Sequence, residues 1–345
     1  MGVPLASMVK GTPIVLEQMK GRRIAIDAFN TLYQFLTVIR DRMTGLPLMD
    51  SKGRVTSHLS GLLYRTTNLL EAGMRPVYVF DGKPPAWKHA TLAERRETRA
   101  AAGEAWKELS EAGAPSEEIL KAAKMSTRLT DEMIGHSEQL LTLMGIPWMR
   151  APSEGEAQAA WMCSEGLVWS VASQDWDSIL FGSPRLVRNL TVAGKRRVPT
   201  KGAMHEVVPE LVELKKVLSD LGLTREQLIA MAMLMGTDFN PGGVRGIGPK
   251  NALKIVKEEK SLEKIIMKAV EKSPWNGPAP DELMDFFLNP PHAEKLKLEP
   301  SPLQADKLRK MLVDDFEFGP VRIDKAVASL EKLQPKEGGL GKWVK

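Results

Sequence analysis

Three short apolar runs that each lead into an aspartate constrain the fold of this chain more than any other feature. The runs and their acids are residues 23–26 with Asp27, residues 76–80 with Asp81, and residues 168–172 with Asp175. Helical patterns separate the runs, and short continuous apolar runs of this kind are typical of buried parallel strands. The chain is therefore expected to form an α/β fold with a central, mostly parallel sheet flanked by helices.

Seven acids follow these strands or the segments after them: Asp27, Asp81, Glu154, Glu156, Asp175, Asp177 and Asp238. Ligands bind outside the carboxyl ends of parallel strands, so we expect the acids to converge in one crevice. Crowded carboxylates repel one another, and burial raises their pKa values, unless a cation neutralises them. Oxygen ligands favour hard divalent ions, chiefly Mg²⁺. Because a two-metal site needs carboxylates from several elements, the seven acids predict such a site.

The same acids also fit purely structural interpretations. Ser153 and Glu156 have the spacing of a capping box at the start of a helix. Asp175 and Asp177 fit a turn that caps the next helix, although alternation along an extended strand would place both on one side. Asp238 fits the end of a helix. The sequence by itself leaves these alternatives open.

Residues 82–135 differ from the rest of the chain in being rich in Ala, Lys, Arg and Glu. Their apolar stripe is too narrow for a core element, so we expect two helices that stand away from the sheet. Lys88, Arg95 and Arg99 have the spacing i, i+7 and i+11, which places them on one face of the first helix. This face is either an ordinary solvated surface or one that overhangs the metal site and stabilises charge on a phosphate.

A glycine hairpin at residues 246–250 precedes a helix with proline at its first position. It follows a helix that we expect to begin with the capping box at 224–227 and to end near Gly236. Gly246 and Gly248 would let backbone N–H groups approach a phosphate, and Lys250 adds a positive charge. The segment is thus either a simple turn or a grip on a DNA backbone without sequence preference.

Composition constrains the binding partners and the cellular compartment expected for the protein. The formal net charge is +5, and a basic surface around an acidic site suits a polyanion, although a mildly basic enzyme without one remains open. Cys163 is the only cysteine, so no intrachain disulfide is possible and an intracellular setting is expected. No apolar run approaches the roughly 20 residues of a membrane span, and the N-terminus does not resemble a secretory signal.

Taken together, these segments resemble the archaeal flap endonucleases, a family of structure-specific 5′ nucleases. The resemblance covers essentially the whole chain. The matching segments are residues 26–28, 79–85, 147–157, 175–182, 236–239 and 245–250. The resemblance implies a PIN-like 5′ nuclease fold with a helical arch and a helix–two-turn–helix subdomain.

The resemblance also implies roles for single residues. Asp27, Asp81, Glu154 and Glu156 match the ligands of a first Mg²⁺, and Asp175, Asp177 and Asp238 match those of a second, with Glu156 able to bridge. Lys88 and Arg95 match catalytic, positively charged residues of the arch that reach the scissile phosphate. The residues expected to contact DNA are Tyr33, Arg40, Arg65, Arg99, Glu154, Gly236, Asp238, Gly246, Gly248 and Lys250. Tyr33 is the aromatic expected to stack on a nucleotide, although from the sequence it equally fits a core position.

Further implications concern ions and the ends of the chain. Mn²⁺ is expected to be able to serve in place of Mg²⁺. K⁺ is expected to bind the helix–two-turn–helix at 243–250. Gly2 matches a glycine close to the active site. The tail is expected to bind a sliding clamp through 337–345, with Leu340, Trp343 and Val344 in contact. Glu337 and Val344 depart from the usual clamp motif, which begins with Gln and ends in two aromatics, and Trp176 stands where Tyr or Met is more usual.

The resemblance divides the chain into functional regions. These are an N-terminal nuclease region at 1–99, a helical arch at 82–135, an internal nuclease region at 117–261 with a helix-hairpin-helix-type motif at 236–258, a C-terminal helical part at 262–333, and a flexible tail at 334–345.

The expected function is a Mg²⁺-dependent phosphodiesterase: a structure-specific 5′ flap endonuclease with 5′–3′ exonuclease activity. It would cut branched DNA at the junction of a 5′ flap and a duplex, in Okazaki-fragment processing and base-excision repair. The expected setting is a monomer in the cytoplasm of an archaeal cell, associated with the nucleoid. Two alternatives remain: a PIN-fold metal-dependent RNase, and a non-catalytic protein that binds DNA junctions.

Overall fold

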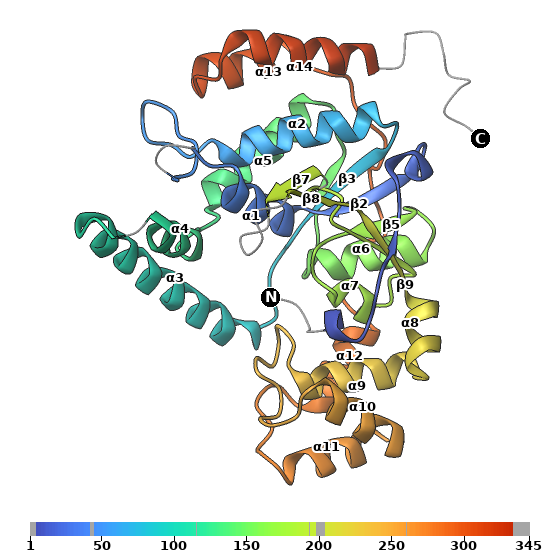
Figure 1. Ribbon diagram of the computed structural model, residues 1–345. Coiled ribbons are helices and arrows are strands. Elements are labelled where there is room, and N and C mark those ends of the chain that lie inside the picture. Colours follow the sequence, from blue (N-terminus) through green and yellow to red (C-terminus); the bar gives the residue numbers. More distant parts are fainter. Residues whose placement is uncertain are drawn as a thin grey trace.

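A seven-stranded sheet lies at the centre of the computed structural model (Figure 1), which describes residues 5–41, 45–114, 116–192, 194–197, 204–259 and 261–333. The strand order is β1-β9-β6-β5-β2-β3-β4. The strands are β1 Thr12–Pro13, β2 Arg23–Asp27, β3 Arg75–Phe80, β4 Trp148–Arg150, β5 Ser170–Ala172, β6 Arg185–Arg188 and β9 Glu210–Glu213. Gly2 and the expected clamp-binding residues Leu340, Trp343 and Val344 lie outside the described residues.

Five neighbouring strands, β6-β5-β2-β3-β4, run parallel, whereas β9 and β1 complete one edge in antiparallel pairing. The prediction of a mostly parallel sheet is confirmed. The chain passes from β2 through β3 to β4 on one side, and then places β5 and β6 on the other side of β2. The strand order therefore reverses between β2 and β5, which is the point where ligands bind in open α/β sheets.

The apolar runs are continuous because the central strands are buried on both faces. Successive side chains of a strand point to opposite faces, so each strand supplies two separate cores. Ala25, Val77 and Val79 belong to one core, and Ile24, Ile26, Tyr78 and Phe80 belong to the other. Helices cover both faces of the sheet and complete these cores.

The helices divide between the two cores. The first core contains α6 Gly155–Ser164, α7 Asp177–Leu180, α8 Leu214–Leu221, α9 Arg225–Met235, α10 Pro249–Glu258, α11 Leu262–Val270 and α12 Pro280–Leu288. The second contains α1 Ala28–Val38, α2 Ser57–Glu71, α5 Asp131–Leu143, α13 Ala305–Arg309, the π-helical turn Lys310–Asp315 and α14 Pro320–Leu333. Two short 3₁₀ helices, Leu5–Ser7 and Leu16–Met19, lie near the N-terminus. Among the described residues, no helix is both long enough and apolar enough to cross a membrane.

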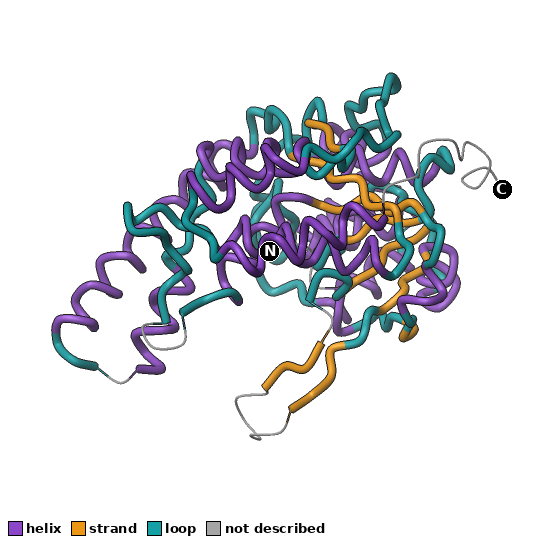
Figure 2. Tube along the Cα trace, turned by 90° about the horizontal axis from the view of Figure 1, so that it is seen from above, coloured by secondary structure: helices purple, strands orange, loops and turns teal. Residues whose placement is uncertain are grey.

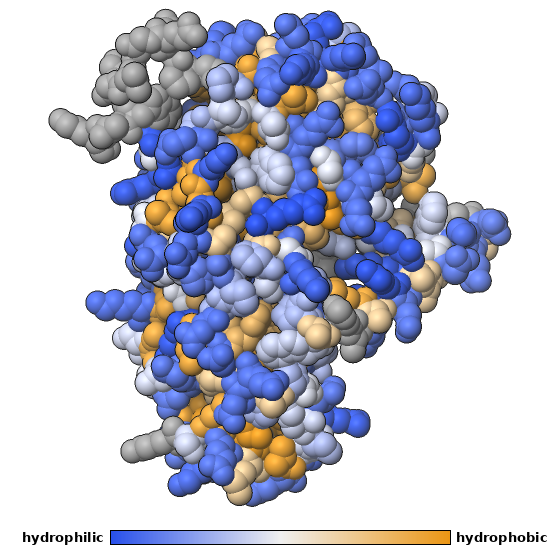
Figure 3. Space-filling model, turned by 180° about the vertical axis from the view of Figure 1, so that it is seen from behind, coloured by the Kyte–Doolittle hydropathy of each residue, from blue (hydrophilic) through white to orange (hydrophobic). Residues whose placement is uncertain are grey.

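Two segments project from this body. The helices expected within 82–135 are α3 Lys88–Glu111 and α4 Ser116–Met125, which pack on each other and extend away from the sheet (Figures 1 and 2). We call this pair the arch; its surface on the back of the molecule is mainly hydrophilic (Figure 3). The second projection is the hairpin of β7 Gly194–Arg197 and β8 Met204–Val207. The first core, the second core and the arch thus surround the carboxyl ends of the parallel strands.

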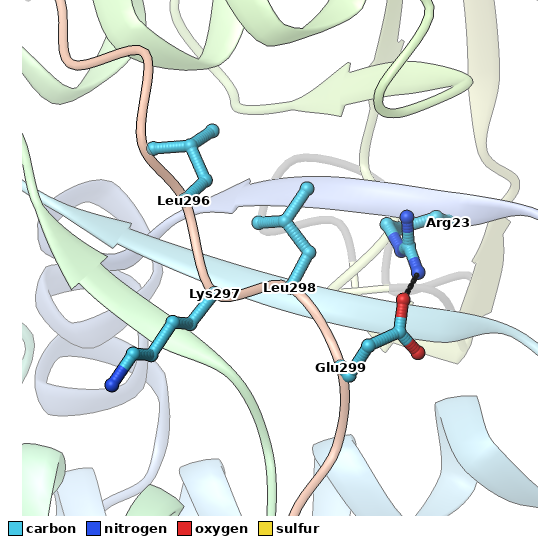
Figure 4. A pocket seen from close by; sticks show the side chains of 5 residues that line it. All are labelled: Arg23, Leu296, Lys297, Leu298 and Glu299. Carbon is cyan, nitrogen blue, oxygen red and sulfur yellow. Dashed lines mark hydrogen bonds and ion pairs between the residues drawn. The ribbon is translucent and has the colours of Figure 1, made fainter.

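An extended segment, residues 289–304, joins α12 to α13 and so connects the two helical groups. Its backbone at Ala293 is bound by the Gln158 side chain at 2.7 and 3.1 Å, and Glu299 pairs with Arg23 at 2.8 Å (Figure 4). A cavity of about 530 Å³ lies here, lined by Arg23 and residues 296–299. Since Arg23 begins β2 and Asp27 ends it, this cavity is at the opposite end of the strand from the acids.

Candidate active site

The parallel strands deliver six of the seven acids to one edge of the sheet. Asp27 is the last residue of β2, Asp81 directly follows β3, Glu154 and Glu156 follow β4, and Asp175 and Asp177 follow β5. The seventh acid, Asp238, comes from the loop after α9. Because β2 and β5 flank the reversal of strand order, their acids face the crevice that this reversal creates.

Electrostatic repulsion connects all seven acids in one set. The interacting pairs are Asp27 with Asp81 and Asp175, Glu156 with Asp27, Asp175 and Asp177, and Asp238 with Asp81 and Glu154. The structure therefore brings together the acids that lie more than 200 residues apart in the chain.

The acids are difficult to ionise together. Burial, followed by the charge of Asp81, raises the pKa of Asp27 to about 8. Burial raises the pKa of Glu154 to about 7, and Asp81 adds to the effect. Burial and then Asp177 raise the pKa of Glu156 well above its ordinary value. Ionising all of these groups together would require more positive charge beside them than the protein supplies.

Two cations from the arch supply part of that charge. Lys88 pairs with Glu154, and Arg95 pairs with Asp238 at 2.6 Å. Burial alone would lower the pKa of Lys88, but Glu154 and Asp81 raise it, so the ammonium group is charged. The pKa of Glu154 is nevertheless raised, because burial and the other acids outweigh the single positive charge of Lys88. Negative charge is thus in excess at this site.

The donor set fits a hard divalent cation. The Glu156 Oε1 atom is buried and has no hydrogen-bond partner among the described residues. Within the same part of the chain, no three His, Cys, Asp or Glu side chains lie close enough together to hold a metal ion as they stand, and Lys88 and Arg95 contact two of the carboxylates instead. An unpaired buried oxygen beside crowded carboxylates is the environment that a metal ion would satisfy.

Two of the structural alternatives, the capping box and the turn that caps the next helix, do not hold. Helix α6 has Glu154 as its N-cap without a side-chain cap, so the capping box of Ser153 and Glu156 is wrong. Helix α7 has Trp176 as its N-cap, again without a side-chain cap. The prediction that Asp175 and Asp177 lie on one side of an extended strand is also wrong. Strand β5 ends at Ala172, and Asp177 already begins α7.

Neighbouring polar groups that the sequence did not indicate hold the acids in place. Ser173 donates to Asp27 Oδ2 at 3.0 Å, and Asn30 donates to Asp175 Oδ2 at 2.9 Å. The Gly155 N–H donates to Asp81 Oδ1 at 2.7 Å, and a Cβ on Gly155 would lie 2.9 Å from that oxygen. The only available signal was their position, one to three residues from an acid.

The remaining residues with expected roles in DNA binding lie at different distances from the acids. Arg99 covers the ring of Tyr33 at 4.9 Å, so the half-buried tyrosine faces the arch rather than a core. Arg65 is half-buried on α2. Arg40 lies beyond the far end of α1, roughly 17 Å of helix from Asp27. Its guanidinium donates to oxygens of the loop and the arch, which no sequence pattern indicated.

The glycine hairpin has the expected form. The capping box at 224–227 is present, α9 ends at Met235 with Gly236 as its C-cap, and α10 begins at Pro249. Gly246 has φ +88°, in the left-handed region, and Gly248 is the N-cap of α10. A Cβ at either of these two glycines would meet no atom within 4 Å, so the backbone is open to a large ligand. Lys250 is exposed beside it.

Comparisons with known proteins match nearly the whole chain. Residues 3–102 match the XPG N-terminal domain, and residues 145–238 match the XPG I-region. Flap endonuclease 1 of Staphylothermus marinus is 49% identical over 352 residues, covering 99% of both chains. The structure of flap endonuclease-1 from Methanococcus jannaschii is 40% identical with a TM-score of 0.75, covering 96% of this chain and 98% of that chain. The catalytic core of Rad2 in complex with DNA substrate is 25% identical with a TM-score of 0.66, covering 93% and 96%.

Proposed function

The chain belongs to the flap endonuclease family, and from this we propose that it hydrolyses DNA at the junction of a 5′ single-stranded flap and a duplex. The products would be a 5′-phosphate and a 3′-hydroxyl. A single observation carries this proposal. Seven acids and two cations from the arch lie together at the point where the strand order of the sheet reverses. A 5′–3′ exonuclease activity at the same site, and a role in Okazaki-fragment processing and base-excision repair at the nucleoid, belong to this proposal.

We propose Mg²⁺ as the metal, with Mn²⁺ able to replace it. Asp27, Asp81, Glu154 and Glu156 would hold one ion, and Asp175, Asp177 and Asp238 a second. Two such ions activate a water molecule and stabilise the leaving 3′ oxygen when they are bound. Excess negative charge and the unpaired Glu156 Oε1 support this assignment, because each would be relieved by a divalent cation.

Lys88 and Arg95 would bind the scissile phosphate. Both residues lie on α3 and enter the acid cluster, where their only opposite charges are carboxylates that the metal ions would also use. If metal ions held those carboxylates, the ammonium and guanidinium groups would be available to a phosphate. Tyr33, which lies under Arg99 near this edge, would stack on the adjacent base.

The hairpin and its helix would hold the duplex by its backbone. Open glycine backbone at Gly246 and Gly248, the N-terminus of α10 and Lys250 all suit phosphate oxygens and read no bases. We propose a K⁺ ion at 243–250 and a division of the chain as the family resemblance suggests. We also propose that the protein acts as a monomer and that its tail binds a sliding clamp.

A labelled 5′-flap substrate tests the proposal. Wild-type protein should cut it with Mg²⁺ and not with EDTA, whereas Asp81→Ala and Asp175→Ala should bind the flap and fail to cut it. Exposed Asp220→Asn is the matched control, because its only described ion pair is the surface pair with Lys216. Near-wild-type turnover by either alanine variant would contradict the metal assignment. Cutting of RNA in preference to flap DNA would favour the RNase alternative, and binding without cutting by wild type would favour the non-catalytic one.

A further inference from the structure

A second cavity lies between the arch and the body. Its volume is about 190 Å³, smaller than the roughly 300–1,000 Å³ of sites for drug-sized ligands, so it suits a fragment such as one planar ring system. The walls come from α1, the connection after it, both arch helices and α5. The lining residues are Leu36, Arg40, Leu46, Pro47, Met49, Val55, Trp106, Ala123, Ser126, Thr127, Arg128 and Met133. The lining contains two arginines and an indole but no acid, so it disfavours a cation.

One face of α3 runs from the acids to this cavity. Lys88, Arg95, Arg99 and Trp106 have the spacing 0, 7, 11 and 18, and 18 residues are five full helical turns. The contacts agree with the spacing, since Lys88 and Arg95 reach the acids, Arg99 covers Tyr33, and Trp106 lines the cavity. The rise from Lys88 to Trp106 is about 27 Å. A row of three cations thus ends at an aromatic ring.

Arg40 brings a positive charge to the cavity wall, and its hydrogen-bond acceptors there leave this charge unneutralised. Its guanidinium donates to Thr37 O at 3.2 Å, Gly45 O at 3.1 Å, and Thr127 Oγ1 at 2.9 Å. It also donates to Ala123 O at 3.3 Å. All four acceptors are uncharged, and among the described residues Arg40 has no ion pair, so the cavity retains attraction for an anion.

An exposed apolar side chain contributes to the cavity. Eight large apolar side chains are exposed among the described residues, and they include Val38 at 54%, Met49 at 45% and Met125 at 53%. Met49 itself lines the cavity, while Val38 and Met125 are within two residues of lining residues. Apolar surface beside arginines and an indole suits a base with its attached phosphate, which joins a flat apolar ring to a negative charge.

We propose that this cavity binds one unpaired nucleobase of the 5′ flap, with Trp106 stacking on the base and Arg40 facing its phosphate. The proposal rests on the proposed function and adds a site to it. At about 3.4 Å per nucleotide in a stacked strand, the 27 Å of α3 correspond to at most about eight nucleotides, and fewer in an extended strand. A one-nucleotide flap cannot reach the cavity, whereas a ten-nucleotide flap can.

The test compares one-nucleotide and ten-nucleotide flaps on the same duplex. Trp106→Ala should raise the Kd for the long flap by about 5- to 100-fold, as loss of one stacked base does, and change the short flap less than about twofold. Trp106→Phe should retain the preference for the long flap. Ser126→Leu, which would narrow the cavity from the segment after α4, should also remove this preference while the indole is retained. Lys107→Ala is the matched control on the same helix, because Lys107 is exposed and pairs only with Glu104 on the surface.

A flap with abasic sites at its fourth to eighth nucleotides separates base binding from phosphate binding. Wild type should bind it about as weakly as Trp106→Ala binds the normal long flap. Equal affinity for the abasic and normal long flaps, or an unchanged long-flap Kd in Trp106→Ala and Ser126→Leu, would overturn the proposal. Short-flap cleavage reports separately on the proposed function, since its absence in wild type with Mg²⁺ would refute that function and the base site with it.

Discussion

Replacing Asp27 by asparagine should stabilise the metal-free protein while it abolishes nuclease activity. Asn keeps the shape of the side chain, can still accept from the Asn30 N–H that caps α1, and can still contact Ser173. It removes a carboxyl that burial and Asp81 make hard to ionise. A residue that is retained although it destabilises the fold is expected where function requires the charge.

The magnitude follows from the shift in pKa. The pKa of Asp27 rises from 3.8 to about 8 on folding, so the stability that this carboxyl contributes is fully present below pH 3.8 and is lost as the pH rises towards 8. At pH 7 the cost is about 1.4 kcal/mol for each of the roughly three pH units above 3.8, or about 4 kcal/mol at most. Because Asp81 and Asp175 share the repulsion, we expect a gain of about 2–4 kcal/mol for Asp27→Asn at pH 7, and of less than about 2 kcal/mol at pH 5.

Chemical unfolding in EDTA at both pH values measures this difference. Asp220→Asn serves as the control for loss of a surface acid, and its stability should stay within about 0.5 kcal/mol of wild type. Adding Mg²⁺ should stabilise wild type much more than Asp27→Asn, because ligand binding to the folded state adds to stability. A metal-free variant that is less stable than wild type at pH 7, or a gain that is the same at pH 5 and pH 7, would refute the reasoning.

Three other substitutions test separate parts of the account. Lys88→Ala should lower the single-turnover rate by about 10²–10³-fold with little loss of flap affinity, since its charge is needed where charge develops on the phosphate. Gly155→Ala would place a methyl group against Asp81 and should weaken Mg²⁺ binding by about 10–100-fold, which a Mg²⁺ titration of activity would show. Burial lowers the pKa of His58 from 6.5 to about 3, so on acidification the unfolded chain takes up a proton before the folded protein does. The contribution of His58 to stability should therefore fall by up to about 5 kcal/mol from pH 6.5 to pH 3, and the difference in stability between His58→Phe and wild type in urea unfolding should grow by that amount.

Much of the acid cluster could be predicted because it depends on the sheet. Six of the acids follow parallel strands, and the carboxyl ends of such strands meet at one edge regardless of how the loops run. The strands themselves were visible as apolar runs because two cores bury both faces of β2 and β3. The antiparallel strands β1 and β9 and the hairpin of β7 and β8 were not predicted, because two- to four-residue strands carry little periodic signal.

Interactions between distant polar groups could not be predicted in the same way. Ser173 and Asn30 hold acids through hydrogen bonds whose partners are about 145 residues away, and a polar residue near an acid has no pattern that reveals this. Arg40 shows the same difficulty, since it bonds to Ala123 and Thr127 of the arch. Asp238 was included in the predicted cluster, but it follows helix α9 rather than a strand, so the position of the strand ends does not by itself explain why it joins the other acids.

Counting bound metal ions tests the central claim most directly. Titration of the protein with Mn²⁺, followed by electron paramagnetic resonance in the presence of cleaved flap DNA, should show two ions per wild-type chain. Asp27→Asn and Asp175→Asn should each bind fewer, and Asp220→Asn should still bind two. Absence of Mn²⁺ binding by wild type, or two ions in all three variants, would contradict the assignment of these acids to a shared metal site.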